Sequence, residues 1–393
     1  MDSTERGLPS EPDGTERGGL VVVGAGVIGL SCAWRAARDG VSVTVVDPAP
    51  ASGASWVAGG MLAPVTEAWP GEEPLLELGA ESLLRWPSFA AALATDAGLP
   101  NGGAPAGLRT EGTLVVAAGA GDRAELDELA AFLARLGRDV ERVTARELRR
   151  LEPSIGPDVR GGLSVPGDLA VDNRTLLAAL RAACERSGVR LVEQAAVTVG
   201  PGTVQLSGGR ELAAGEVLVA AGAHSSALHP SLAGLVRPVK GEILRLRHRA
   251  GAFPPPARTV RGVVEGRHVY LVPRDDGGLV IGATQYEAGF DTDPTVGGVR
   301  DLLRDAERLV PAVAEFALLE SSAGLRPGSP DNLPLIGRLG PGVLVATGHG
   351  RNGILLAPIT SEAVLAMLRG TPVPAAATAA DPGRLLEAPC ASR

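Results

Sequence analysis

Residues 20–30 read LVVVGAGVIGL, and this stretch decides the fold. The apolar run is typical of a strand, and the glycines at positions 24, 26 and 29 predict a tight turn into a helix that ends at Gly40. A second apolar run, VSVTVV, follows and ends at Asp47. This order of strand, glycine turn, helix, strand and acid predicts a dinucleotide site, with the pyrophosphate at the helix N-terminus and Asp47 on the ribose hydroxyls.

Two more apolar strands run directly into glycine. They read VLVAAGA from Val217 and VLVATGHG from Val343. Uninterrupted apolar runs are typical of strands buried on both faces of a parallel sheet, where ligands bind beyond the carboxyl ends of the strands. We therefore predict that three strand ends, far apart in the sequence, meet at one cofactor.

Composition and charge exclude several classes of function. The chain has 393 residues, enough for two domains, and its net charge of −8 disfavours nucleic acid as a partner. The longest apolar runs have strand length and residues 1–18 have no apolar segment, so we expect no membrane span and no targeting signal. Cys32, Cys184 and Cys390 lack metal-ligand spacing, which indicates reduced thiols, a cytoplasmic protein and no metal site.

The middle of the chain changes to the pattern of an antiparallel sheet. EILRLR and HVYLVP alternate apolar and polar residues, and DDGG separates HVYLVP from LVIGAT as a hairpin turn would. Asp172 and Asp122 are expected to cap two amphipathic helices, and Thr144 with Glu147 fits a capping box. These helices are expected to supply core packing and no chemistry.

Two glycine-rich stretches favour FAD over a nicotinamide nucleotide. Residues 51–64 read ASGASWVAGGMLAP, and such small residues let the backbone lie against the pyrophosphate and ribityl chain. Residues 348–354 read GHGRNGI and place a helix N-terminus beside the ligand. A reduced flavin carries negative charge near N1 and O2, which a helix N-terminus stabilises. A simple NAD domain does not need a second glycine-rich turn from so late in the sequence.

On these residues the chain resembles the glycine oxidase and D-amino-acid oxidase family, and within it the glycine oxidase branch associated with thiamine biosynthesis. The most specific stretches are GAGVIGL, SGASWVAGGML, GLRPGSPDNLPLIG and GHGRNGILLAP. The resemblance implies oxidation of glycine, or of another small amine or D-amino acid, to the imine and oxo acid. Dioxygen would be reduced to hydrogen peroxide, and the glycine imine would pass to thiazole formation. A D-amino-acid or sarcosine-type oxidase or dehydrogenase remains the alternative on this scaffold.

The resemblance also implies the fold class and the domain organisation. We expect a mixed α/β and α+β architecture, with a Rossmann-like FAD-binding domain and an inserted substrate domain built on an antiparallel sheet. A homo-oligomer is expected because family members often form one. The assigned ranges are 19–62, 168–235 and 322–370 for the FAD-binding domain, 63–167 and 236–321 for the substrate domain, and 1–18 and 371–393 for a disordered lead and tail.

The resemblance gives site residues their roles. Arg326, in GLRP, matches the carboxylate-binding arginine, and Tyr270, in VYLVP, matches the tyrosine that helps to hold the carboxylate. His268 would share a strand face with Tyr270. Met61 and Arg351 complete the substrate contacts, although Arg351 could also touch only the flavin or a partner carboxylate. The expected cofactor contacts are Gly24, Ala25, Gly26, Val27, Ile28, Gly29, Asp47, Ser55, Gly59, Gly60, Met61, Val197, Gly222, Gly348, His349, Gly350, Arg351, Asn352, Gly353 and Ile354.

These residue types suit an α-amino acid. Arginine holds a carboxylate bidentately and thereby directs the Cα–H bond toward the flavin. Hydride transfer from an uncharged amine needs no strong protein base, and His349 is expected to be a turn residue. Related sarcosine oxidases attach flavin through a cysteine near the segment that here reads GLRPGSPDN, so we expect non-covalent FAD. A nicotinamide-dependent dehydrogenase and a flavin-binding module without turnover are the competing classes.

Overall fold

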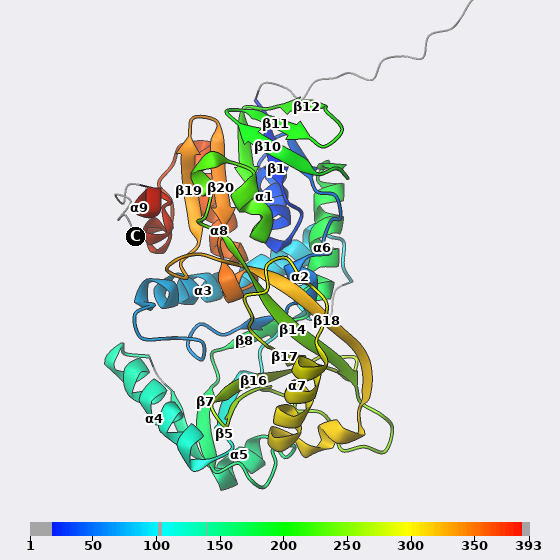
Figure 1. Ribbon diagram of the computed structural model, residues 1–393, viewed down its shortest axis with the longest axis vertical. Coiled ribbons are helices and arrows are strands. Elements are labelled where there is room, and N and C mark those ends of the chain that lie inside the picture. The colour runs from blue at the N-terminus through cyan, green and yellow to red at the C-terminus, as the bar shows by residue number, and fades with distance from the viewer. Residues whose placement is uncertain (1–17, 101–103, 139, 387–393) are drawn as a thin grey trace, which may run out of the picture.

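The computed structural model describes residues 18–100, 104–138 and 140–386, which form two domains arranged along the long axis of the molecule (Figure 1). The first domain is built on a six-stranded sheet in the order β19-β20-β13-β1-β2-β9. As predicted, the three strands that end in glycine are parallel neighbours, because β1 pairs with β13 and β13 pairs with β20. The strands are β1 (Leu20–Val23), β2 (Val43–Val46), β9 (Arg190–Val192), β13 (Glu216–Val219), β19 (Leu335–Gly340) and β20 (Val343–Thr347).

Both faces of the parallel sheet are covered. One face packs against helices α1 (Val27–Arg38), α6 (Asn173–Arg186) and α8 (Ala357–Arg369). Apolar residues on the other face share a core with a small sheet at the far end of the domain (Figure 1). The strands of that small sheet are β10 (Ala196–Gly200), β11 (Thr203–Leu206) and β12 (Glu211–Ala213).

Helix α3 (Glu73–Asp96) corrects the expected domain boundary at residue 63. The helix packs against α6 and α8 of the parallel-sheet domain, and Phe89 contacts Trp34 of α1 edge to face at 5.2 Å. Trp86 is fully buried, and its indole N–H donates to the Leu355 carbonyl at 2.9 Å. This helix therefore packs with the first domain, whereas the strands between Thr113 and Val165 belong to the sheet of the second.

The second domain is built on an eight-stranded sheet in the order β18-β14-β17-β16-β15-β5-β7-β6. All of its pairs are antiparallel except β15 with β5, and the hairpin predicted from DDGG joins β16 to β17. Figure 1 shows α7 (Val296–Leu309), α5 (Ala145–Leu151) and α4 (Ala120–Arg135) around this sheet. The strands are β5 (Thr113–Ala117), β6 (Glu141–Thr144), β7 (Gly161–Val165), β14 (Arg237–Arg247), β15 (Thr259–Val264), β16 (Arg267–Pro273), β17 (Gly278–Gly282) and β18 (Ala317–Gly328).

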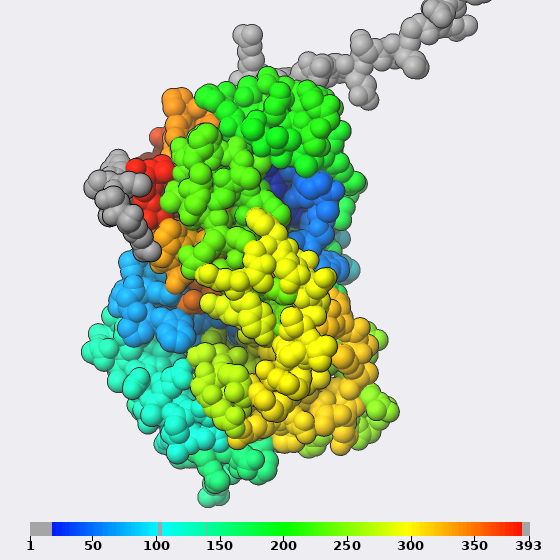
Figure 2. All heavy atoms as spheres, viewed as in Figure 1, coloured from blue at the N-terminus to red at the C-terminus, as the bar shows by residue number. Residues whose placement is uncertain are grey.

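A third, short sheet lies at the junction of the two domains. Its order is β3-β8-β4, with β3 (Met61–Leu62), β8 (Leu169–Val171) and β4 (Leu108–Arg109). In the space-filling view, the segment that follows β17, drawn in yellow, lies across this junction (Figure 2). The segment brings Thr284 and Gln285 to the cavity described below.

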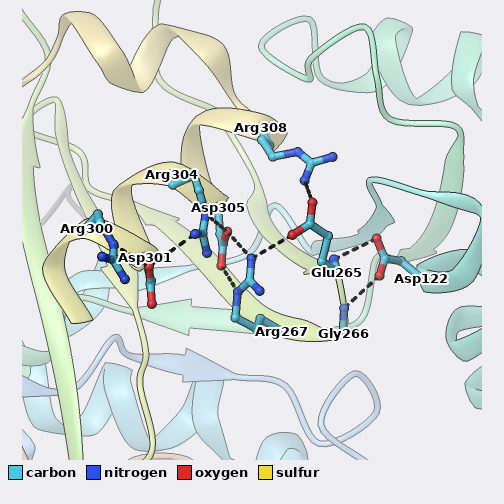
Figure 3. Close-up of polar contacts among 9 residues, drawn as sticks. All are labelled: Asp122, Glu265, Gly266, Arg267, Arg300, Asp301, Arg304, Asp305 and Arg308. Atoms are coloured by element: carbon cyan, nitrogen blue, oxygen red, sulfur yellow. Dashed lines mark hydrogen bonds and ion pairs between the residues drawn. The ribbon is translucent and has the colours of Figure 1, made fainter. Parts of the chain in front are cut away.

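Two of the three predicted helix caps are confirmed. The Asp172 carboxylate accepts hydrogen bonds from the first N–H groups of α6, and Thr144 with Glu147 forms the capping box of α5. The prediction for Asp122 is wrong, because α4 begins at Ala120 after Gly119. The Asp122 carboxylate is buried and accepts from the N–H groups of Glu265 and Gly266, at 3.2 and 3.0 Å (Figure 3). Asp122 therefore ties α4 to the turn between β15 and β16.

The expected disorder of residues 371–393 is wrong for residues 371–386. A 3-10 helix (Ala375–Ala380) packs against α3 and β19, with Ala377 and Ala380 buried. A last short helix, α9 (Gly383–Leu386), follows, and Arg384 binds Asp331 at 2.8 Å. The small alanine side chains let this segment pack against α3 and β19, which composition alone does not reveal. Residues 1–17 and 387–393, where disorder was also expected, lie outside the described residues.

The thiols and the helices of the described residues give two further findings. Cys32 and Cys184 are free and buried, as predicted, and burial raises the pKa of each thiol to about 12. In the same parts of the chain, no helix combines the length and the apolar character that a membrane crossing requires.

Candidate active site

A cavity of about 970 Å³ runs from the glycine turn after β1 to the edge of the antiparallel sheet. This volume is near the upper end of the usual range for ligand pockets, roughly 300–1,000 Å³. Nearly all the residues that were expected to contact the cofactor or substrate line it. Four expected cofactor contacts lie behind the lining instead: Ala25, Gly29, Gly348 and Asn352.

The glycine turn forms a narrow cradle at one end of the cavity. Gly24 has φ +110°, and a Cβ there would lie 2.3 Å from the carbonyl oxygen of Ala220 on the neighbouring strand. A Cβ at Gly29 would lie 1.8 Å from the Gly24 carbonyl oxygen, so this glycine lets α1 approach the turn. Gly26 is the N-cap of α1 and provides no side-chain cap. The cradle therefore presents backbone and a helix N-terminus, which suits a pyrophosphate.

Two polar side chains hold this turn. The Asp47 carboxylate lines the cavity and accepts from the N–H groups of Ala25 at 2.7 Å and Ala49 at 2.8 Å. The Ser55 hydroxyl accepts from the Val27 N–H at 3.1 Å. Asp47 thus stands at the end of β2, beside the cradle, where a ribose hydroxyl could reach its carboxylate.

Tyr270 lies at the other end of the cavity. It stands opposite Gly282 in the β16–β17 pair, and its ring occupies the space that two glycines leave. A Cβ at Gly59 would lie 2.6 Å from Cε2 of the ring, and one at Gly282 would lie 2.3 Å from Cζ. Burial raises the pKa of Tyr270, so its hydroxyl is a neutral hydrogen-bond donor at neutral pH.

Three arginines line the cavity, and their partners differ. Arg261 pairs with Glu67 at 2.6 Å, and Arg351 pairs with Glu72 at 2.7 Å. Arg326 of β18 donates only to the carbonyl oxygen of Thr284, at 3.1 Å, and no carboxylate of the described residues pairs with it. Arg326 is therefore the guanidinium of this cavity that is open to an anionic ligand.

The remaining predicted side chains have defined partners. Arg351 lines the cavity and also binds the Glu72 carboxylate and the Glu67 carbonyl oxygen, at 2.7 and 3.0 Å. His268 lines the cavity near Tyr270, with its Nε2 atom 3.1 Å from Oε1 of Glu125. Met61 of β3 packs in one apolar cluster with Tyr270.

His349 lies in the turn that follows β20, and its side chain has a partner within the fold. Its ring is buried, and Nε2 lies 3.1 Å from the hydroxyl of Thr360. Burial lowers the pKa of His349 to about 3, so the imidazole is neutral at the pH values where the protein would work.

Sequence reasoning missed several residues of the lining. Arg261 stands directly opposite Tyr270 in the β15–β16 pair, so pairing the TVRGVV strand with HVYLVP would have found it. Glu67, Trp69 and Glu72 lie in the irregular segment between β3 and α3, where no periodicity marks a residue. Thr284 and Gln285 follow β17 and reach the cavity only because the chain turns back there.

The comparison with known families decides the identity of this fold. The model of the FAD-dependent oxidoreductase (DAO) family matches residues 20–367. The chain belongs to the FAD-dependent oxidoreductase family. This membership, together with the relatives described next, confirms the predicted fold class and FAD as the cofactor, and the glycine cradle fits that cofactor.

Relatives in the DAO family carry informative names. The chain is 34% identical over 359 residues to the bifunctional protein ThiO/ThiG of Synechocystis sp., an alignment that covers 88% of this chain and 50% of that protein. It is 32% identical over 356 residues to the glycine oxidase of Geobacillus kaustophilus, covering 88% and 91%. The crystal structure of that glycine oxidase superposes with a TM-score of 0.83 at 30% identity, covering 92% and 97%. The chain spans about half the length of the bifunctional relatives that it matches.

Proposed function

We propose that this chain is an FAD-dependent amino-acid oxidase of the glycine oxidase type. The observation that carries the proposal is Arg326, the one cavity-lining guanidinium that no carboxylate of the described residues pairs with. It lies in the same cavity as the buried Tyr270 hydroxyl. A cation and a neutral donor suit the carboxylate of an α-amino acid. The relatives named glycine oxidase support glycine as the substrate.

Arg326 and Tyr270 would bind and orient the substrate. A charge-assisted hydrogen bond is worth roughly 1.5–3 kcal/mol, and holding the carboxylate would restrict the directions in which the Cα–H bonds can point. When bound, FAD accepts the hydride equivalent from this carbon. The amine must be uncharged for that step. Glu67 and Glu72 are engaged with arginines, and a pKa lowered to about 3 makes His349 a weak base, so these three groups favour positioning over proton abstraction.

The cavity lining suggests which residues would hold each part of the cofactor. Gly24, Gly26 and Asp47 would hold its ADP part, while Gly59, Gly60, Met61 and residues 348–354 would lie near the flavin ring. Cys32 and Cys184 are buried in helices and do not line the cavity, which supports non-covalent FAD. Acid precipitation tests this part of the proposal, since all the flavin should remain in the supernatant.

The fate of the electrons and of the product completes the proposal. We expect dioxygen to reoxidise the flavin with release of hydrogen peroxide. The glycine-derived imine would supply thiamine thiazole synthesis, and the relatives named ThiO/ThiG support that role. An oxidase or dehydrogenase of D-amino acids or N-methyl amino acids is the second candidate on the same site.

An anaerobic titration tests the proposed function. The purified protein is given glycine in the absence of oxygen, and the flavin absorption is recorded before and after air is admitted. Bleaching by glycine, with recovery and peroxide release in air, is the expected result. Bleaching by D-alanine or sarcosine but not by glycine would transfer the function to the second candidate. A flavin that stays oxidised with every amine would reject both.

A further inference from the structure

Arg261 provides a second cation on the wall that carries Tyr270. The two residues are directly opposite each other in the antiparallel β15–β16 pair, so their side chains extend from the same face of the sheet. Both residues line the cavity, and the Arg261 side chain is only 13% exposed. A ligand held by Tyr270 and Arg326 therefore lies beside another guanidinium.

Glu67 neutralises this second cation. Its Oε1 atom accepts from Nη1 of Arg261 at 2.6 Å, and its side chain is 12% exposed. The two charges thus form a nearly buried ion pair inside the cavity. In such a pair each ion depends on the other, because water no longer solvates either charge.

The segment around Glu67 holds this carboxylate in place. The Glu67 N–H donates to the Ala63 carbonyl oxygen at 3.1 Å, and the Glu67 carbonyl oxygen accepts from Arg351 at 3.0 Å. The hydroxyl of the preceding Thr66 donates to the buried Asp168 at 2.9 Å. Glu67 is therefore fixed by contacts on both sides, and its carboxylate occupies the position that a ligand carboxylate would take at Arg261.

We propose that Glu67 is an internal carboxylate that fills a second carboxylate subsite at Arg261 and so restricts the enzyme to substrates with one carboxylate. The inference rests on the proposed function, because it requires that Arg326 and Tyr270 hold the α-carboxylate. An amino dicarboxylic acid would bring its second carboxylate against Glu67. Like charges repel strongly where little water reaches them, and the Glu67 side chain is only 12% exposed. Such repulsion is how a site excludes a substrate that its other contacts accept.

Replacing Glu67 by glutamine should reverse this selectivity. The change keeps the shape of the side chain and leaves the Arg261 cation for the substrate. We expect kcat/KM for at least one of aminomalonate, D-aspartate and D-glutamate to rise relative to glycine by roughly tenfold to a hundredfold, the value of one charge-assisted contact. The double variant Glu67→Gln/Arg261→Gln should lose this gain. Glu77→Gln is the matched control, because Glu77 forms a 2.7 Å ion pair with Arg138 outside the cavity.

A binding measurement separates this inference from the proposed function. Acetate, malonate, succinate and glutarate are titrated into the FAD-loaded protein, and the shift in flavin absorption reports their affinity without turnover. In Glu67→Gln the affinity of at least one diacid relative to acetate should rise by roughly tenfold or more over wild type. Glu67→Ala carries the same expectation if the glutamine variant does not retain FAD.

The outcomes of the two measurements differ. Unchanged ratios in both kinetics and binding, in variants that retain FAD, would overturn the proposal while leaving glycine oxidation intact. A gain that persists in the double variant would also overturn it, because Arg261 would then not be the subsite. A wild-type flavin that glycine does not reduce would reject the proposed function, and the diacid-to-acetate ratio would still report on the Arg261 subsite.

Discussion

Arg274 should be among the most important buried charges for the stability of this fold. It follows β16 in the second domain, and its side chain is only 5% exposed. One guanidinium nitrogen donates to the Gly59 carbonyl oxygen at 2.8 Å and to Asn173 Oδ1 at 3.2 Å, while Nε lies 3.2 Å from the Asp172 carboxylate. Burial lowers the pKa of Arg274 to about 10, so it is charged at neutral pH. It links the antiparallel sheet to the first turn of α6 and to the cavity lining.

The cost of removing this guanidinium follows from its contacts. Arg274→Met leaves the Gly59 carbonyl oxygen without this donor, and an unsatisfied buried acceptor costs about 1–3 kcal/mol. Asn173 Oδ1 keeps a hydrogen bond from Arg245 at 3.1 Å. The Asp172 side chain is 28% exposed, so water can replace part of the lost ion pair. The unsatisfied Gly59 acceptor gives a loss of about 1–3 kcal/mol in the free energy of unfolding. That loss is a large fraction of the roughly 5–15 kcal/mol typical of a folded protein.

Urea unfolding of the FAD-saturated protein measures this cost, and FAD titration gives a second readout. The affinity for FAD should fall as well, because the Gly59 carbonyl belongs to the cavity lining. Arg300→Met is the matched control, since Arg300 is 71% exposed and Asp301 is its only ion-pair partner in the described parts of the chain. We expect a change below about 0.5 kcal/mol. If Arg274→Met matches the control in both stability and FAD affinity, the reasoning from buried contacts is refuted.

Three other substitutions test separate parts of the structure. Arg326→Lys should lower kcat/KM for glycine by roughly tenfold to a hundredfold, because lysine cannot reproduce the bidentate contact, and unchanged peroxide release would remove Arg326 from the site. Gly26→Val should abolish FAD retention by filling the cradle, whereas Gly121→Val, at a position with open space around it, should retain it; equal flavin absorption would contradict this. Burial raises the pKa of Asp168 to about 7, so the folded protein binds more protons than the unfolded chain between about pH 4 and 7. Stability should therefore fall as pH rises through that range, by about 4 kcal/mol at most, and Asp168→Asn should lose this slope in urea unfolding at pH 4.5–8; equal slopes would disprove the assignment.

Local sequence patterns predicted those parts of the fold that depend on residues close together in the sequence. The strand that ends at Gly24 and its two counterparts became parallel neighbours, because a strand buried on both faces has no other stable environment in this fold. The caps at Asp172 and Thr144 were also predictable, since a cap depends on residues within one turn.

Features that depend on distant partners were not predictable in this way. Asp122 has the residue type and position of a helix cap, but its carboxylate binds a turn more than 140 positions later. Nearby, Arg267 binds the buried Asp305 of α7, which is another contact between distant segments (Figure 3). The Ala-rich tail illustrates the same limit, because its order comes from the surface of α3 and β19 and not from its own composition.

The candidate site shows the same difference between residues that a sequence motif marks and residues that only the fold brings together. The glycine cradle lies in a motif, and so do Arg326 and Tyr270; in the proposed function these residues would hold the cofactor and one carboxylate. The charges that would select among amino acids lie outside the motifs, because Glu67 and Glu72 come from an irregular segment and neutralise Arg261 and Arg351. A change of one residue in that segment alters the net charge of the cavity without touching the cradle. Substrate range in this family should therefore follow the segment after β3 more closely than the glycine motif.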